Sequence, residues 1–318
     1  MTGLPKVSVA IVTYNQESFI RQTLDSVIAQ DYENMEIIVS DDGSSDRTPE
    51  IIKEYADMYP GLLKIILSDN NTGIAENCNR AFFSCTGEYI AWLGGDDLFY
   101  PHKITHQVKA MEKNGECDLC FHAVRVFDSQ SGVTIAITNT KEREKRNVRQ
   151  LLYDGVSLPS SAIMVRRSSC PVNGFNVGIP RANDWLFYLE SMLNGYVMRI
   201  DGVFSGYRMH NGNITRNSLI DDMHKTYEHI RYLRPDLTSF ANRAEAIACY
   251  HEGRKLLNIG EHTKAQSIFL KGIKLSPLYF RLWTWFMFSG LGKHGIKTLK
   301  SSYQFMARLA RKNPRHDI

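Results

Sequence analysis

Residues 87–101 read GEYIAWLGGDDLFYP, and this stretch joins an apolar run to two adjacent acids. The run from Tyr89 to Leu93 predicts a buried strand, which ends at Gly94-Gly95-Asp96-Asp97. Carboxylates at the carboxyl end of a buried strand are costly unless a positive group lies on them, and open α/β sheets bind ligands at that edge. The pattern therefore predicts a divalent cation held by carboxylates and phosphate oxygens. Gly-Gly-Asp-Asp is equally suited to a solvated turn, so both interpretations stand at this point.

Three strand and helix pairs are expected before this stretch. The predicted strands cover residues 7–13, 36–40 and 62–67, and the predicted helices cover 17–30, a segment from 48 onward, and 74–85. This β-α alternation within a hundred residues predicts an α/β fold with a doubly wound, mostly parallel sheet. The second strand ends at Asp41-Asp42, so both acidic pairs are expected at the same edge of the sheet.

The middle of the chain mixes strands and helices, and the last third is expected to be helical. After a helix ending near residue 114, strands are expected near 119–127, 161–165 and 196–200, with a helix at 184–193. The mixed-charge run 141–149 is expected to be a solvated loop or the start of a helix. Only helices are expected from residue 219, so the predicted domains are an α/β domain at 1–217 and a helical region at 218–318. Within the latter, residues 248–277 resemble one tetratricopeptide unit and predict a helical hairpin.

Composition and missing motifs exclude several classes of protein. The net charge is +4, but residues 281–318 hold eight Lys and Arg against one acid, which leaves the rest of the chain near neutral to acidic. Nucleic acid is therefore not an expected partner. The sequence lacks G-x-G-x-x-G after the first strand, a P-loop and a G-x-S-x-G elbow, which argues against dinucleotide oxidoreductases, P-loop enzymes and α/β-hydrolases.

The cysteines and the first residues indicate where the protein works. Six cysteines are scattered along the chain, and the pair Cys117 and Cys120 lies in an apolar segment, so buried structural thiols are favoured over a zinc site. The first residues lead directly into a strand, and no apolar run reaches the ~20 residues of a membrane span. These features predict a cytoplasmic protein.

Four motifs stand in order within the first two hundred residues: VSVAIVTYNQESFI, EIIVSDDGSSDRTPEII, NTGIAENCNRAFFSCTGEYIAWLGGDD and NDW. Together they resemble the nucleotide-sugar glycosyltransferases of family 2, which have the GT-A fold and invert the anomeric centre. The resemblance implies that the ends of the first two strands hold the nucleobase and ribose of the donor. The residues concerned are Thr13, Tyr14, Asn15, Asp41 and Asp42.

The same resemblance implies the reactive groups. The family's Asp-x-Asp corresponds to Gly94-Gly95-Asp96, so Gly95 and Asp96 are expected at the donor diphosphate, with Mn²⁺ or Mg²⁺ on Asp96. The catalytic base corresponds to Asp184. Two positions depart from the family: Gly94 replaces the first aspartate, and Cys78-Asn79 replaces Arg-Asn, which keeps Asn79 as a donor contact but removes a positive charge. A processive polymerase is not expected, because the chain has no Gln-x-x-Arg-Trp segment and no membrane spans.

Three further residues are candidates on chemical grounds. Arg208 suits a phosphate and His210 suits a metal, although a solvated loop is the other interpretation of this polar segment. Asp97 is expected to join Asp96 and His210 around the metal. An inverting displacement needs one base and a cation for the leaving diphosphate, which fits Asp184 as base; its other interpretation is a helix N-cap.

The sequence thus predicts the transfer of one sugar from a nucleotide-diphosphate donor, UDP favoured, to a hydroxyl of a saccharide or lipid-linked saccharide acceptor in cell-surface polysaccharide synthesis. A binding or scaffold protein with a degenerate site, working through its helical region, is the alternative. A nucleotidyltransferase is a third option, weakened by the lack of a glycine-rich N-terminal loop with Arg or Lys.

The C-terminal segment indicates where in the cell the protein works. Residues 282–291 are rich in Trp and Phe, and from Ile296 to Ala310 apolar residues recur at steps of three and four with cations beside them. Such a stripe suits a helix on an anionic membrane surface, on the cytoplasmic face. A helix docked on the catalytic domain fits the same pattern.

Overall fold

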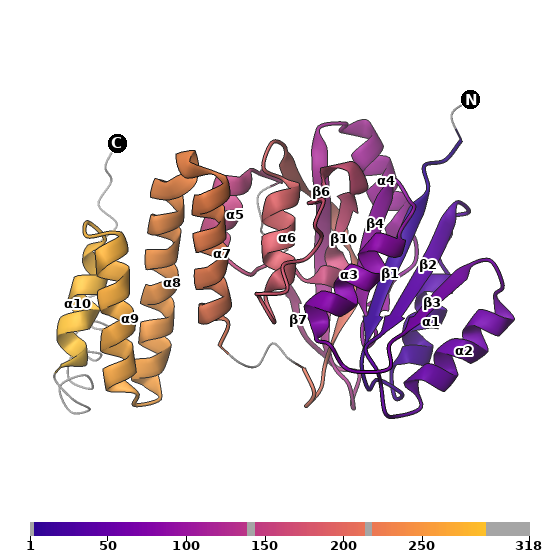
Figure 1. Cartoon of the computed structure of the whole chain (residues 1–318), viewed down its shortest axis with the longest axis horizontal. Helices are drawn as coiled ribbons and strands as arrows, with labels where there is room; N and C mark the ends of the chain where they lie inside the picture. The colour runs from indigo at the N-terminus through magenta and orange to yellow at the C-terminus, as the bar shows by residue number, and fades with distance from the viewer. Residues whose placement is uncertain (1–2, 139–143, 214–217, 291–318) are drawn as a thin grey trace. The chain divides into compact units, whose positions relative to one another are not determined.

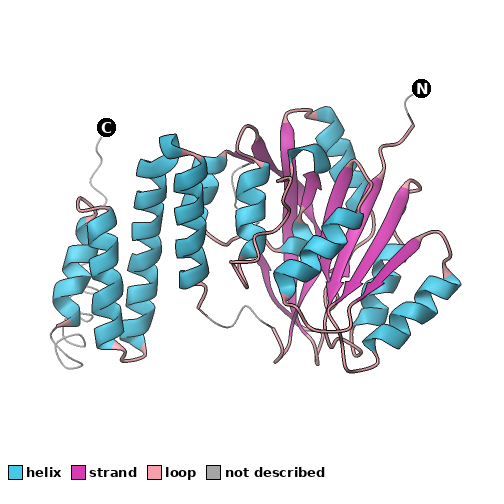
Figure 2. Cartoon of the chain, viewed as in Figure 1, coloured by secondary structure: helices cyan, strands magenta, loops and turns pink. Residues whose placement is uncertain are grey.

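The computed structural model describes residues 3–138, 144–213 and 218–290, and shows an α/β part followed by helices (Figure 1; Figure 2). The strands are β1 (Val7–Thr13), β2 (Met35–Asp41), β3 (Leu63–Leu67), β4 (Tyr89–Gly94), β5 (Leu98–Phe99), β6 (Cys117–Asp128), β7 (Thr134–Thr138), β8 (Lys145–Arg146), β9 (Met164–Arg166) and β10 (Tyr196–Met209). The helices are α1 (Ile20–Ile28), α2 (Thr48–Met58), α3 (Ile74–Ser84), α4 (Lys103–Lys113), α5 (Val148–Asp154), α6 (Asn183–Ser191), α7 (Ile220–Leu233), α8 (Thr238–Asn258), α9 (His262–Leu275) and α10 (Phe280–Ser289).

The ten strands found in the described residues belong to one sheet. Its order is β3-β2-β1-β4-β9-β6-β10-β5, with β7 added to β6 and β8 to β10. The first four strands are parallel, as predicted, and β6 is parallel to β10. The short β9 is antiparallel to both of its neighbours and joins the two halves. Because β1, β2 and β4 run the same way, the residues that follow them meet at one edge.

Helices cover both faces of this sheet. Val9, Ile37 and Leu93 belong to a buried cluster that also contains apolar side chains of α1, α2 and α4. Successive strand residues point to opposite faces, so Trp92 lies on the other face. There its ring centroid lies 6.0 Å from that of Phe187 in α6. The continuous apolar character of β1 and β4 follows from this two-sided cover.

Several boundaries differ from those expected. The predicted strand at 161–165 is a 3-10 turn, η1 (Ser160–Ala162), followed by β9. The strand predicted at 196–200 continues to Met209. The mixed-charge run at 141–149 is not simply solvated: residues 141–143 lie outside the described residues, but Arg146 is buried in β8 and pairs with Asp154 at 2.7 Å.

The chain divides into two compact units, Met1–Thr226 and Tyr227–Ile318. The expected boundary lay after residue 217. The difference arises because the start of α7 belongs to the first unit: a carboxylate oxygen of Asp222 accepts the backbone N–H groups of Arg181 and Ala182, at 2.8 and 2.9 Å.

The second unit is helical in its described part, as predicted. Helices α8 and α9 form a hairpin, and Gly253 faces Phe269 so closely that a Cβ there would overlap the ring, 2.6 Å from its Cζ. A glycine is therefore needed for the two helices to approach. Leu282 of α10 completes the buried cluster of this unit. No helix among the described residues is apolar over a length that would cross a bilayer.

Candidate functional site

The loops after β1 and β2 are fastened to each other at the carboxyl edge of the sheet. Asn15 donates its backbone N–H to Ser44 Oγ at 2.8 Å, and its own Oδ1 accepts the N–H of Ser45 at 2.9 Å. Asn15 has a φ of 52°, a left-handed conformation in which asparagine is several-fold enriched. The fastened loops hold Thr13 buried at the end of β1 and leave Tyr14 exposed beside it.

The two acids after β2 have different amounts of free acceptor capacity. Asp42 accepts four hydrogen bonds, from the N–H and hydroxyl of Thr72, the N–H of Gly73 and Nη2 of Arg80, at 2.6–3.0 Å. Burial alone would raise the pKa of Asp42, but these donors outweigh it and the pKa is lowered. Asp41 accepts only two, both from Ser44, and burial raises its pKa. A carboxylate has about four acceptor sites, so Asp41 retains capacity for a ligand and Asp42 does not.

Helix α3 does not place Asn79 toward the donor edge. Its side-chain amide accepts the N–H of Phe175 at 2.7 Å and donates to the carbonyl of the same residue at 2.9 Å. Asn79 therefore positions the loop before α6, which differs from the donor contact expected for it. Cys78 is a buried thiol whose pKa is raised by burial and then by the charge of Asp184. Arg80, two positions further along α3, pairs with Asp42 at 2.6 Å.

The two glycines before the acids both lie close to other atoms, and a glycine is required at position 95. A Cβ on Gly95 would lie 2.7 Å from Cβ of Thr13, so only glycine lets the ends of β1 and β4 approach. A Cβ on Gly94 would lie 2.8 Å from Oδ1 of Asp96. The carboxylate of Asp96 thus turns back into the space that the family's first aspartate would begin to fill.

The end of β10 brings Arg208 and His210 to the acids after β4. Arg208 donates its N–H to Asp97 Oδ1 at 3.0 Å and its Nε to the carbonyl of Asp96 at 2.7 Å. Its guanidinium lies 4.9 Å from the ring centroids of both Phe19 and Phe127. His210 Nε2 lies 2.9 Å from Asp96 Oδ2, and its Nδ1 lies 3.1 Å from the backbone nitrogen of Gly212.

The arrangement corrects the expected metal ligand set. Among the described residues, no group of three or more His, Cys, Asp and Glu side chains is arranged to hold a metal ion. Asp97 is buried, and burial and then the charge of Asp96 raise its pKa well above the usual value. It faces the protein, away from solvent. Asp96 and His210 remain as a partly exposed pair, which fits Mg²⁺ or Mn²⁺ if phosphate oxygens and waters complete the coordination.

Asp184 lies in the first turn of α6, not at its N-cap, which is Ala182. Its Oδ1 accepts the N–H of Trp185 at 2.8 Å and its Oδ2 accepts the hydroxyl of Ser160 at 3.1 Å. Burial raises the pKa of Asp184 to about 6, although both hydrogen bonds lower it. A carboxylate with such a pKa is ionised at neutral pH and still basic enough to take a proton.

The turn η1 connects Asp184 to the acids after β4. Ser160 donates to Asp184, and the next residue, Ser161, lies near the side chain of Asp97 and acts against burial to lower the pKa of that acid. Two adjacent residues therefore lie at the expected base and at the neighbour of Asp96. Sequence reasoning missed Ser160, Ser161 and Arg80. Arg80 stood two positions after the missing arginine, whereas a pair of serines carries no distinctive signal.

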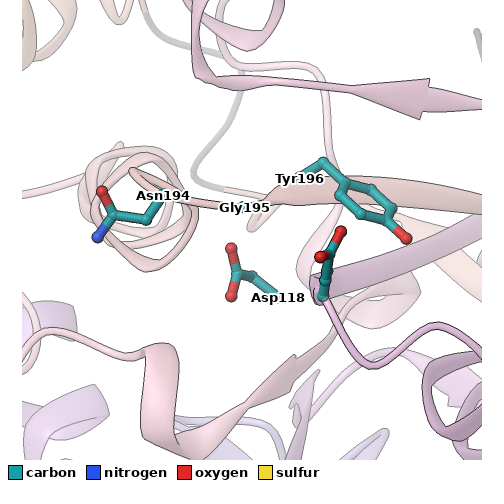
Figure 3. A pocket seen from close by; sticks show the side chains of 5 residues that line it. Asp118, Asn194, Gly195 and Tyr196 are labelled. Carbon is teal, nitrogen blue, oxygen red and sulfur yellow. The ribbon is translucent and has the colours of Figure 1, made fainter.

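A separate pocket lies away from these residues, at the amino ends of β6 and β10. It has a volume of about 420 Å³ and is lined by Glu116, Asp118, Asn194, Gly195 and Tyr196. Figure 3 shows the carboxylate of Asp118 directed toward the backbone at Gly195. The hydroxyl of Ser169 donates to Oδ1 of Asp118 at 2.6 Å, which fixes this side chain in the pocket lining.

With this geometry in place, comparison with known proteins identifies the family. The profile of glycosyl transferase family 2 matches residues 8–171, from β1 to just beyond β9. The chain belongs to glycosyl transferase family 2. An uncharacterized protein of Mycobacterium tuberculosis is 31% identical over 220 residues, which are 68% of this chain and 62% of that protein. An uncharacterized glycosyltransferase of Rickettsia typhi is 40% identical over 112 residues, 35% of this chain and 34% of its own length.

Solved structures confirm the GT-A fold predicted for the chain. S. aureus TarS residues 1–349, crystallised with UDP-GlcNAc, superposes with a TM-score of 0.66 at 18% identity and covers 94% of this chain and 91% of its own. The mannosyltransferase PcManGT from Pyrobaculum calidifontis, crystallised with GDP-Man and Mn²⁺, superposes with a TM-score of 0.55 at 18% identity, over 91% and 85% of the two chains. At these identities the likeness concerns the fold alone.

Proposed function

We propose that this family 2 protein transfers a single sugar from a nucleotide-diphosphate sugar to an acceptor hydroxyl, with inversion at the anomeric carbon. The observation that carries the proposal is the turn η1, in which Ser160 donates a hydrogen bond to Asp184 and the adjacent Ser161 lies near Asp97, the neighbour of Asp96. A base and a diphosphate-binding acid at one sheet edge are the two groups that a direct displacement needs.

Each part of the reaction has a residue in this chain. Asp184 takes the proton of the acceptor hydroxyl while that oxygen attacks the anomeric carbon, and the bond from this carbon to the diphosphate breaks. Thr13, Tyr14, Asn15 and Asp41 are proposed to hold the nucleoside, and Arg208 to face the diphosphate. A divalent cation on Asp96 and His210 would neutralise the charge of the departing diphosphate.

The donor and acceptor are proposed at the level of chemical class. A uridine diphosphate sugar is favoured, because TarS was crystallised with UDP-GlcNAc and is similar over nearly the whole chain. A divalent cation is supported by PcManGT, which was crystallised with Mn²⁺. The acceptor is proposed to be a hydroxyl of a saccharide or lipid-linked saccharide used in cell-surface polysaccharide synthesis.

A donor panel tests this function. Full-length protein is heated with UDP-, dTDP- and GDP-sugars, each with Mn²⁺, with Mg²⁺ or with EDTA. One class of donor is expected to raise the melting temperature only with metal, because bound ligand stabilises the folded state. Asp96→Ala should abolish this rise, and Asp57→Ala, at an exposed acid of α2, should keep it. Equal stabilisation of the Asp96→Ala variant would overturn the assignment of Asp96, and no stabilisation by any donor would favour the scaffold alternative.

We further propose that the protein works in the cytoplasm, at the surface of an anionic membrane. All six cysteines are free, as in a reducing compartment. Helix α10, which contains most of the Trp- and Phe-rich segment, has a buried and an exposed side: Leu282 is buried in the second unit, whereas Phe280, Trp283 and Met287 are 72%, 43% and 68% exposed. These three lie at steps of three and four along α10, so one face of the helix presents large apolar side chains of the kind found at bilayer interfaces. The predicted helix from Ile296 lies outside the described residues.

A further inference from the structure

The hairpin of β6 and β7 carries apolar side chains that the fold does not bury. Val133, Ile135 and Ile137, here called the hairpin row, are 62%, 59% and 50% exposed. Within the described residues β7 pairs only with β6. Exposed β-branched residues on an edge strand are an aggregation hazard that proteins usually avoid. A group of them therefore indicates an interaction site.

The hairpin row continues the face of the sheet that carries the site. Ile137 pairs with Arg125 of β6, and paired residues of an antiparallel ladder point to the same face. Ile135 is the extra residue at a register shift between Ala136 and Thr134, so together with Thr134 it lies opposite Phe127 of β6. On β6, the guanidinium of Arg125 lies 5.2 Å from the ring centroid of Phe127, which also contacts Arg208. A continuous path therefore leads from Asp96 through Arg208, Phe127 and Arg125 to the hairpin row.

Arg125 introduces a positive charge at the inner end of this row. Its donors bind Thr134 Oγ1 at 2.7 Å, the carbonyl of Gly132 at 2.5 Å and the hydroxyl of Tyr100 at 3.4 Å, all of them neutral acceptors. No ion pair of Arg125 is formed with any residue in the described part of the chain. A guanidinium beside an enzyme site, held in place yet without an anion, is suited to bind a phosphate.

We propose that the β6–β7 hairpin is the acceptor subsite for an amphiphile, in which Arg125 binds a lipid phosphate and Ile135 and Ile137 contact the first part of its apolar chain. This proposal rests on the proposed function, because it names the class of acceptor for the same site. A second copy of the chain is the less suitable occupant, since three side chains are far fewer than the 20–30 residues per partner of a stable interface.

Binding of simple alkyl phosphates tests the subsite without need of the natural acceptor. Full-length protein is titrated calorimetrically with dodecyl phosphate, below its micelle concentration, and with butyl phosphate. Dodecyl phosphate is expected to bind at least about tenfold more tightly, because each buried CH₂ adds a several-fold gain. Equal binding of the two phosphates would overturn the proposal.

Variants separate the chain contact from the phosphate contact. The double change Ile135→Ser and Ile137→Ser should remove most of the preference for the longer chain, whereas Met58→Ser with Ile259→Ser, two exposed apolar residues elsewhere, should leave it intact. Arg125→Gln should weaken both phosphates and keep the preference. An unchanged preference in the Ile135 and Ile137 variant would contradict the proposal, and binding that appears only above the micelle concentration would indicate a bilayer surface in place of a subsite.

The outcome is distinguishable from failure of the proposed function. Metal-dependent stabilisation by donor sugars should be the same in the hairpin variants and the unchanged protein, because the row lies beyond Arg208. Preferential binding of dodecyl phosphate with no donor binding would contradict the glycosyltransferase assignment alone. Donor binding without a preference for dodecyl phosphate would contradict the hairpin subsite alone.

Discussion

Asp184 determines how the proposed reaction depends on pH. Its pKa is about 6, so the base is ionised at pH 8 and protonated at pH 5. Transfer at saturating donor should fall about tenfold for each pH unit below 6 and should be level above about 7. The pH dependence of turnover, measured in buffers of constant ionic strength, checks this.

A change at Ser160 tests the pKa of Asp184 in a second way. Its hydroxyl donates to Asp184 and lowers the pKa, so Ser160→Ala should move the acid limb of the pH profile to higher pH. Ser169→Ala, at a serine that binds Asp118 instead, serves as the control and should leave the limb in place. A limb that does not move in Ser160→Ala would show that another group controls the profile.

At the scale of residues, positions at strand ends could be predicted from the sequence, whereas the donors that saturate an acid could not. Gly95 and Asp96 follow an apolar strand, so their place at the sheet edge could be predicted. Asp42 is saturated by Thr72, Gly73 and Arg80, some thirty to forty residues away, and no local pattern reveals such donors. The roles in donor and metal binding stay predictions.

At the scale of elements, the contact between β1 and β4 depends on Gly95. Gly95→Ala would place a Cβ 2.7 Å from Cβ of Thr13, so the end of β1 must shift. We expect a loss of about 1–3 kcal/mol of stability and a lower melting temperature, together with weaker donor binding. Gly115→Ala has nothing within 4 Å and should change neither. Unaltered donor binding in Gly95→Ala would show that the strand ends do not form the donor cradle.

The helices and strands could be predicted where the apolar residues follow one clear pattern, either a continuous run or a helical spacing. Strands β1 and β4 are buried along almost their whole length and read as apolar runs, and α3 and α4 show clear helical spacing. The region around η1 and β9 could not be predicted, because Ser161 to Val165 is short and apolar and fits a strand as well as a turn. In the folded chain Ser160 of this turn donates to Asp184, a partner 24 residues away that no local pattern reveals.

At the scale of the whole molecule, the exposed face of α10 and the basic C-terminal segment predict membrane association. Full-length protein is expected to sediment with liposomes that contain anionic lipid and to be released by high salt, since each cation contributes about 1 kcal/mol that salt screens. A chain truncated at residue 280 should stay in the supernatant, and Phe280→Ser with Trp283→Ser should bind more weakly. Equal recovery of the full-length and the folded truncated chain in the supernatant would contradict membrane association.

Whole-molecule stability should also respond to Asp184. The folded pKa of about 6 exceeds the ordinary value of 3.8, so ionisation of this group costs stability as pH rises between these values. Asp184→Asn removes that cost and keeps an oxygen for the N–H of Trp185. Its melting temperature at pH 8 should therefore be no lower than that of the unchanged protein, which makes it a folded variant for the decisive experiment.

The most direct test of the account compares donor binding with turnover in Asp184→Asn. Single-turnover transfer and donor affinity are measured side by side at pH 8, with the stabilising donor and metal. Loss of the base should lower the rate of transfer by about 10²-fold or more, with donor affinity unchanged within about twofold. Retained turnover, or a loss of donor affinity that accounts for the whole decrease in rate, would contradict the assignment of Asp184 as the base.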